Sequence, residues 1–168
     1  MPFKTKKQYR LYGYDYSQNG SYFITIVTRN REHHFGNIDD LKGMQLTHIG
    51  QFVEYNIKQI QQIKKDIEIN EWVIMPNHIH LILTVDNSGE REIIGVTGIR
   101  PLVKNSVSSF VNHFKGIITR WCKENSHANF AWQSRFHDRI IRNPQEYLAI
   151  ANYINTNIAN WKNDSENL

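Results

Sequence analysis

Residues 78–85, HIHLILTV, alternate between two kinds of position. The odd-numbered positions are all aliphatic, whereas the even-numbered positions include His78 and His80. Because successive side chains of a β-strand point to opposite faces of a sheet, this pattern predicts a strand with one wholly apolar face. That face should pack under helices. The two imidazoles should project from the opposite, less covered face, about 7 Å apart along the strand.

The apolar periodicity around this strand predicts an alternating order of strands and helices. Pro76-Asn77 forms a tight polar break, so the runs on its two sides should pair as an antiparallel hairpin. The expected strands span residues 21–29, 67–75, 78–85 and the end of 130–141, and the expected helices span about 49–65, 103–124 and 144–161. The β-α-β-β-α-β order is that of the ferredoxin-like arrangement, so we expect an α+β fold with an antiparallel sheet and one added C-terminal helix.

The C-terminal helix has the clearest start signal. Asn143 is a suitable N-cap, Pro144 suits the first helical position, and Glu146 stands three residues after the cap. Within this helix Tyr153 and Asn157 are four residues apart, so they should be neighbours on its surface beside the apolar stripe.

Length and composition fit a single domain over residues 1–168. No apolar run approaches the roughly 20 residues needed to span a bilayer, and the basic start has no apolar stretch after it, so we expect a cytoplasmic protein without membrane association. The one cysteine, Cys122, excludes an internal disulfide and a CxxC zinc site. We expect a basic, aromatic N-terminal arm over residues 1–20 and a flexible loop over residues 86–102.

Basic residues gather in two parts of the chain. The formal net charge is +4, but residues 100–142 hold eight basic side chains against two acidic ones, and the N-terminal arm combines basic residues with tyrosines. Such a combination suits the backbone and stacked bases of a nucleic acid, although a solvated basic surface is the simpler alternative. The candidate DNA-binding residues are Lys6, Lys7, Arg10, Lys115, Arg120, Arg135, Arg139 and Arg142.

The histidine pair and the Tyr153–Asn157 pair could share one site. Two imidazoles at positions i and i+2 can converge on one divalent metal ion. Since a phenol has a pKa of about 10, Tyr153 would need a cation or a metal-polarised phosphate nearby to act as a nucleophile. Alternatively, the histidines are partly exposed and bind nothing, and Tyr153 is an amphipathic residue at the edge of the core.

Four segments together resemble a known family. They are GYDYSQNGSYFITIVTRNREHHFG, WVIMPNHIHLIL, WQSRFHDRIIRNPQEY and YINTNIANW. They resemble the REP-associated tyrosine transposases, which are similar to the single-tyrosine transposases of small bacterial insertion sequences within the HUH (His, hydrophobic, His) nucleases. The resemblance covers about residues 8–164.

This resemblance implies a metal-dependent endonuclease and strand transferase that acts on single-stranded DNA, at hairpin-flanked sites. It implies His78, His80 and Asn157 as ligands of Mg²⁺ or Mn²⁺, and Tyr153 as the nucleophile that forms a 5′-phosphotyrosine link and frees a 3′-hydroxyl. The metal would polarise the phosphoryl oxygen and orient the phosphate. Relatives often carry Asn-Pro where this chain has Asn157-Ile158, so we expect the helix to continue further here.

Two other functions are compatible with the sequence. One is a domesticated hairpin-DNA-binding protein without cleavage activity, and the other is a small-molecule metalloenzyme built on the two histidines and a third His or Glu ligand. His137 lies in the family-like segment and could approach DNA or the site. The sequence leaves open whether the protein forms a homodimer, which group deprotonates Tyr153, and whether Tyr153 serves its own histidine pair or that of a partner.

Overall fold

A four-stranded antiparallel sheet forms the centre of the computed structural model, which describes residues 14–63, 66–88, 93–94, 102–103, 106–164 and 166–167. The strand order is β4-β5-β1-β8. The strands are β1 (Gly20–Val27), β4 (Ile67–Ile74), β5 (His78–Val85) and β8 (His137–Ile141). With the helices between them, this order confirms the expected ferredoxin-like arrangement.

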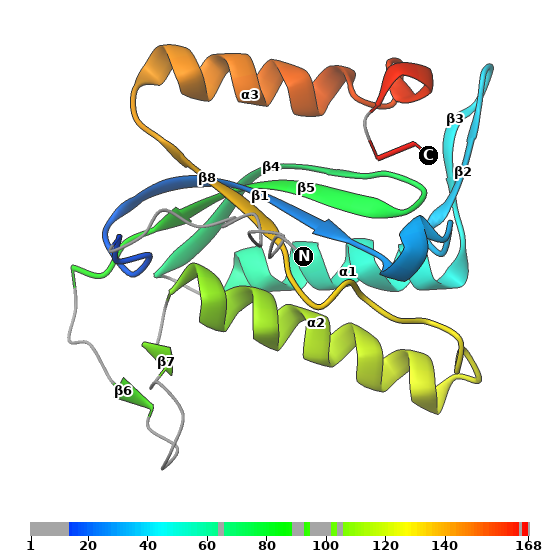
Figure 1. Cartoon of the computed structure of the whole chain (residues 1–168), viewed down its shortest axis with the longest axis horizontal. Helices are drawn as coiled ribbons and strands as arrows, with labels where there is room; N and C mark the ends of the chain where they lie inside the picture. Colours follow the sequence, from blue (N-terminus) through cyan, green and yellow to red (C-terminus); the bar gives the residue numbers. More distant parts are fainter. Residues whose placement is uncertain are drawn as a thin grey trace, which may run out of the picture.

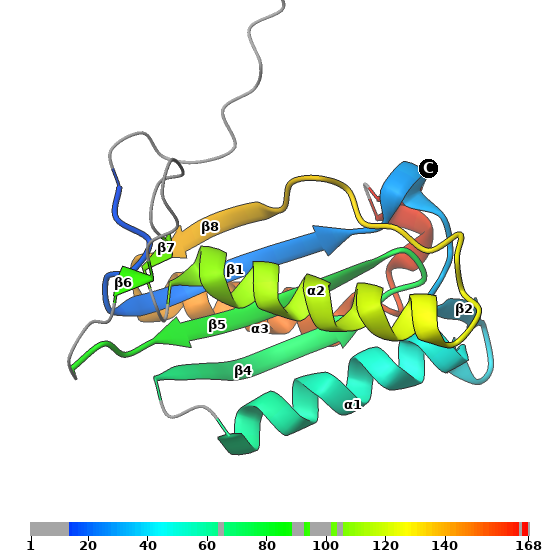
Figure 2. The same cartoon turned by 90° about the horizontal axis from the view of Figure 1, so that it is seen from below.

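Helices cover both faces of the sheet (Figures 1 and 2). Helices α1 (His48–Ile63) and α2 (Val107–Glu124) lie on one face, and α3 (Pro144–Thr156) lies on the other. The main core fills the space under α1 and α2 and contains all four odd-numbered residues of β5, as the alternation in residues 78–85 predicts. A smaller core under α3 contains Ile82 of the opposite face together with Ile150, Ala151 and Ile154.

Helix α2 starts later than the sequence predicts. The expected start near Val103 is wrong, because Val103 pairs with Ile93 in a short antiparallel ribbon of β6 (Ile93–Ile94) and β7 (Leu102–Val103). The helix begins at Val107, where Ser106 is the N-cap and exchanges hydrogen bonds with Ser109 in a capping box. The reciprocal bonds satisfy two groups at the start of the helix, and this local chemistry sets the boundary.

Helix α3 begins as predicted but ends early. The Asn143 side chain accepts a hydrogen bond from the Glu146 backbone N–H, which confirms the N-cap. The expected continuation to about residue 161 is wrong: the α-helix ends at Thr156, Asn157 is its C-cap, and turns lead to the 3-10 helix η2 (Trp161–Asn163). The chain therefore leaves the helix at Asn157 even though the next residue is isoleucine.

Two further elements were not predicted. A hairpin of β2 (Gly36–Asp39) and β3 (Gly43–Leu46) stands at one end of the sheet, beside the C-terminal turn (Figure 1). A Cβ added to Gly36 would lie 2.2 Å from the Gln45 carbonyl oxygen, so the two strands approach at a distance that only glycine permits. The second element is the 3-10 helix η1 (Arg29–Arg31), which follows β1.

Several sequence expectations fall outside the described residues. They are residues 1–13 of the N-terminal arm, with Lys6, Lys7 and Arg10, and residues 89–92 and 95–101 of the expected loop. Within the described part of the chain, no helix is both long enough and apolar enough to cross a membrane.

Candidate functional site

The two histidines of β5 lie under α3 and are buried. His78 is fully buried and only 4% of His80 is exposed. The expectation that the histidines project from a less covered face of the sheet is therefore wrong at this end of the strand. Their Nε2 atoms are 3.0 Å apart. Side chains two residues apart on a strand share a face, and here the rings also tilt toward each other, with centroids 4.5 Å apart.

The other ring nitrogen of each histidine has a defined partner. His78 Nδ1 lies 2.8 Å from Asn77 Oδ1, and His80 Nδ1 lies 2.8 Å from Thr25 Oγ1 on the neighbouring strand β1. An amide oxygen only accepts, so His78 donates from Nδ1 and its Nε2 keeps a free lone pair. Partners of this kind orient imidazole ligands in metal sites.

Burial keeps both imidazoles neutral. It lowers the pKa of His78 to about 4, although the charges of Asp164 and Glu166 oppose this effect. It also lowers the pKa of His80 well below its usual value, with a further contribution from His78. Neutral imidazoles have the lone pairs that a metal ion needs.

Tyr153 on α3 reaches the same place. Ile150 and Ile154 hold the helix on the sheet, so Tyr153 lies at the margin of the interface, 42% exposed. Its hydroxyl oxygen is 3.3 Å from His80 Nε2, and its ring meets the Phe23 ring edge-on. The tertiary structure thus brings together the predicted nucleophile and the predicted histidine pair. Burial, and then the charge of Asp164, raises the pKa of the Tyr153 phenol above its usual value.

Asp164 is the site residue that the sequence did not predict. It follows η2, where the chain turns back over the histidines, and its Oδ2 accepts from the Tyr153 hydroxyl at 3.3 Å and from Asn157 Nδ2 at 3.2 Å. The same oxygen lies 3.9 Å from His78 Nε2. No periodic pattern marks this residue; the only signal is an acidic side chain shortly after the Tyr153–Asn157 pair.

A polar network fastens the C-terminal turn to the sheet. The Glu166 backbone N–H donates to Asp164 Oδ1, and the Asn77 side chain donates to the Glu166 carbonyl oxygen. The Glu166 carboxylate forms an ion pair with Arg31, with 2.8 Å between Oε2 and Nε. These contacts orient the Asp164 carboxylate toward the two imidazoles.

Asn157 contacts the site through its amide nitrogen, which donates to Asp164 Oδ2. It is 2% exposed, and its Oδ1 has no hydrogen-bond partner among the described residues. A buried polar atom without a partner is unfavourable, so this oxygen marks a place for a polar or cationic group.

The donor set fits a divalent metal ion. His78, His80 and Asp164 each offer a ligand atom, and these atoms all lie within 4.8 Å of one another. Two ligands bound at about 2.1 Å and at right angles would be about 3.0 Å apart, which is the separation of the two Nε2 atoms. Asn157, whose amide nitrogen donates to Asp164 Oδ2, also has an oxygen without a hydrogen-bond partner among the described residues. The site can therefore hold a metal next to a tyrosine hydroxyl.

The predicted DNA-binding residues on α2, on β8 and beside β8 have varied surroundings. Lys115 is half-buried: its ammonium donates to the Gln133 carbonyl oxygen at 2.6 Å, and burial lowers its pKa. Arg139 forms an ion pair with Glu146. Arg120, Arg135 and Arg142 are exposed. Lys115 and Arg139 thus already have structural partners, whereas Arg135 lines a cleft beside the site.

The chain is similar to known proteins over most of its length. No family model matches the chain. It is 32% identical to an uncharacterized protein of Haemophilus influenzae over 95% of this chain and 91% of that protein. It is 27% identical to the REP-associated tyrosine transposase of Escherichia coli K12 over 89% of this chain and 71% of that protein.

Solved structures extend the comparison to the fold. The structure of a REP-associated tyrosine transposase bound to a REP hairpin matches with a TM-score of 0.62 and 26% identity, over 92% of this chain and 74% of that one. A Deinococcus radiodurans protein with a provisional transposase assignment has a TM-score of 0.50 at 14% identity, which shows the shared fold alone. Together with the quoted motifs, these matches show that the chain is similar to the REP-associated tyrosine transposases over most of its length.

Proposed function

We propose that this protein is a metal-dependent endonuclease and strand transferase for single-stranded DNA at hairpin-flanked sites, with Tyr153 as its nucleophile. One observation carries the proposal: the Tyr153 hydroxyl lies 3.3 Å from His80 Nε2, at the point where two neutral imidazoles and a carboxylate converge. The related transposase whose structure is known was bound to a REP hairpin, which supports DNA as the partner. The proposal sets this reaction in the cytoplasm.

Three side chains would hold the metal, and a fourth would complete the site. His78 and His80 supply Nε2 atoms, Asp164 supplies a carboxylate oxygen, and Asn157 supplies the oxygen that has no protein partner. A bound Mg²⁺ or Mn²⁺ would supply Lewis-acid polarisation of a phosphoryl oxygen. The chain supports its ligands from behind, since Asn77 and Thr25 hold the two rings by their Nδ1 atoms.

The phenol proton needs an acceptor, because the raised pKa keeps Tyr153 protonated near neutral pH. Asp164 Oδ2 accepts the Tyr153 hydrogen at 3.3 Å, and in the proposed reaction this proton moves to the Asp164 carboxylate. An ionised carboxylate has about four lone-pair sites, so Asp164 can take the proton on one of them and use another for the metal. The bond between Tyr153 Oη and phosphorus forms as the bond to the leaving 3′-oxygen breaks. The products are a 5′-phosphotyrosine and a strand that ends in a 3′-hydroxyl once its oxygen has taken up a proton.

The test is a search for the covalent intermediate. Wild type, Tyr153→Phe and Tyr147→Phe would each be incubated with Mn²⁺ and with hairpin oligonucleotides that carry single-stranded flanks, and then separated on denaturing gels. Tyr147 is a matched control, because it lies on the same helix and packs on the α3 side of the sheet. We expect an adduct with wild type and Tyr147→Phe but none with Tyr153→Phe.

Two results would reject this mechanism. An adduct with Tyr153→Phe would show that another residue is the nucleophile. Tight hairpin binding without any adduct from wild type, in Mg²⁺ or Mn²⁺, would indicate a DNA-binding protein that does not cut.

A further inference from the structure

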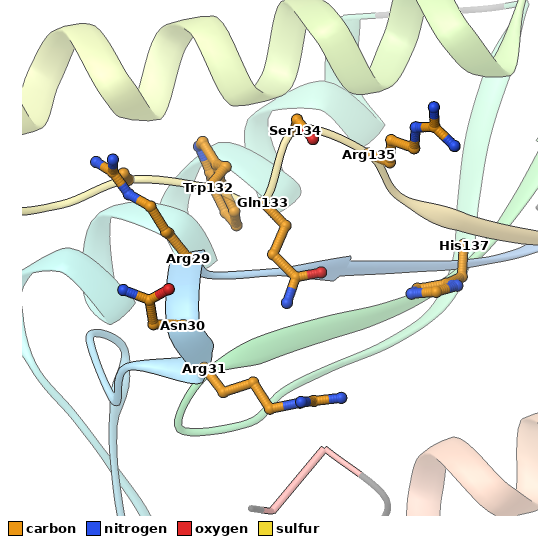
Figure 3. Close-up of a pocket in the computed structure, with 9 residues that line it drawn as sticks. Arg29, Asn30, Arg31, Trp132, Gln133, Ser134, Arg135 and His137 are labelled. Atoms are coloured by element: carbon orange, nitrogen blue, oxygen red, sulfur yellow. The ribbon is translucent and has the colours of Figure 1, made fainter. Parts of the chain in front are cut away.

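A second feature of the surface lies beside the histidine site. It is a cleft of about 820 Å³ between η1 and the segment before β8 (Figure 3). Its lining includes Arg29, Arg31, Gln133, Arg135 and His137, so residues with guanidinium, amide and imidazole groups line the same cleft. In Figure 3 the Gln133 side chain extends into this space between the two backbone segments.

The cleft is positively charged, and two of its arginines form no ion pair with another described residue. None of the described residues that line it is acidic. Arg31 is paired with Glu166, but Arg29 and Arg135 are exposed, and no ion pair joins either of them to another described residue. Two exposed guanidinium groups without an ion-pair partner, one at each side of the cleft, are suited to phosphate oxygens of a strand that runs along it.

The walls of the cleft are tied to the sheet. The Arg29 backbone N–H donates to the Ala131 carbonyl oxygen at 2.8 Å, and the Gln133 N–H donates to the Val27 carbonyl oxygen at 2.9 Å. Asn30 and Arg31 hold left-handed backbone angles, with φ of 57° and 56°. Such angles are costly for residues other than glycine and persist where surrounding structure enforces them. The two walls are therefore presented in a fixed relation to each other.

The cleft adjoins the histidine site through two direct connections. His137, on its wall, is the strand partner of Thr25, whose hydroxyl is bonded to His80. Paired residues of antiparallel strands point to the same face of the sheet, so His137 lies on the face that carries the two histidine ligands. On the other wall, Arg31 is bonded to Glu166, two residues after Asp164.

We propose that this cleft binds the single-stranded DNA segment next to the scissile phosphate. Arg29 and Arg135 contact its phosphates, and the Gln133 amide, which can both donate and accept, contacts a base edge. The assignment rests on the proposed function, because it needs a DNA strand that continues from the cleft to Tyr153. It names Arg29, Gln133 and Arg135 as substrate-binding residues, of which only Arg135 was a candidate from the sequence.

The test measures binding and chemistry separately. Fluorescently labelled hairpin oligonucleotides, with a 5′ tail, a 3′ tail or no tail, would be titrated with wild type, Arg29→Gln/Arg135→Gln and Lys42→Gln/Lys123→Gln at several salt concentrations. Lys42 and Lys123 are exposed and do not line the cleft, so the second variant removes the same charge elsewhere. Circular dichroism and thermal unfolding would show that each variant is folded.

For one tailed hairpin we expect the arginine variant to bind roughly 10-fold more weakly or worse than the lysine variant. The slope of log K against log salt should fall by about 1.4, or about 0.7 for each lost single-strand phosphate contact. Binding of the hairpin without a tail should change equally in both variants. Gln133→Ala should keep the salt slope and change the preference among tail sequences.

Equal affinities of the two double variants for every tailed hairpin would overturn the cleft assignment, as would wild type that binds tailed and untailed hairpins alike. The proposed nuclease function is tested separately, by whether wild type forms the covalent protein–DNA adduct. Wild type that needs the arginines to bind a tail but forms no adduct would support the cleft and reject the nuclease mechanism.

Discussion

Thr25→Val tests whether the support behind His80 matters for metal binding. Thr25 is buried, and its hydroxyl is 2.8 Å from His80 Nδ1. Valine has nearly the same shape, so the substitution removes the hydrogen bond while the proposed ligand and its strand stay in place. It also leaves a ring nitrogen of a buried histidine without a partner.

The expected magnitudes follow from that single lost contact. A buried polar group left unpaired costs about 1–3 kcal/mol, so the free energy of unfolding should fall by about 2 kcal/mol. For a chain of this length that corresponds to a melting temperature lower by about 4–8 °C. Loss of a partner that orients a metal-bound imidazole reduces metal affinity by about 10-fold to 100-fold.

Thr84→Val is the matched control. Thr84 stands on the same face of β5 as His80, but its hydroxyl bonds to Ser21 and Asn70 and lies away from the imidazoles. Mn²⁺ affinity would be measured by isothermal titration calorimetry, and stability by urea unfolding of the metal-free proteins. If Thr25→Val lost no more Mn²⁺ affinity than Thr84→Val, the argument that Thr25 holds a metal ligand would be refuted.

Three further predictions concern acid, the proton acceptor and a helix cap. In metal-free protein, His78 should contribute about 2 kcal/mol to the stability lost between pH 7 and pH 5 in urea unfolding, because the unfolded chain protonates His78 near pH 6.5 and the folded chain only near pH 4. His80 should add to this loss, so His78→Gln should remove only the His78 part of the slope. Asp164→Asn should slow adduct formation by about 100-fold or more, and an unchanged rate in a quench-flow or gel assay would contradict its role as proton acceptor. Asn143→Ala should lower stability by about 1 kcal/mol in thermal unfolding, whereas Asn143→Asp should keep the cap and most of the stability.

Local patterns in the sequence predicted the parts of the fold that depend on neighbouring residues. The alternation in residues 78–85 predicted both bounds of β5 and its apolar face, because side-chain direction on a strand follows from position alone. The N-cap of α3 was also predicted, because a cap depends on a contact between residues only three apart in the chain. The β2–β3 hairpin was missed, since its strands of four residues each are too short for a periodic pattern.

The sequence by itself determined which groups are available: a histidine pair on one strand face, and a tyrosine and an amide on one helix. Only the tertiary structure decided their arrangement. The turn after Thr156 carries Asp164 back over the histidines, and residues 29–31 and 131–137 meet to form the cleft. Both depend on contacts between segments far apart in the chain, such as Arg31 with Glu166, and no local periodicity encodes a contact of that kind.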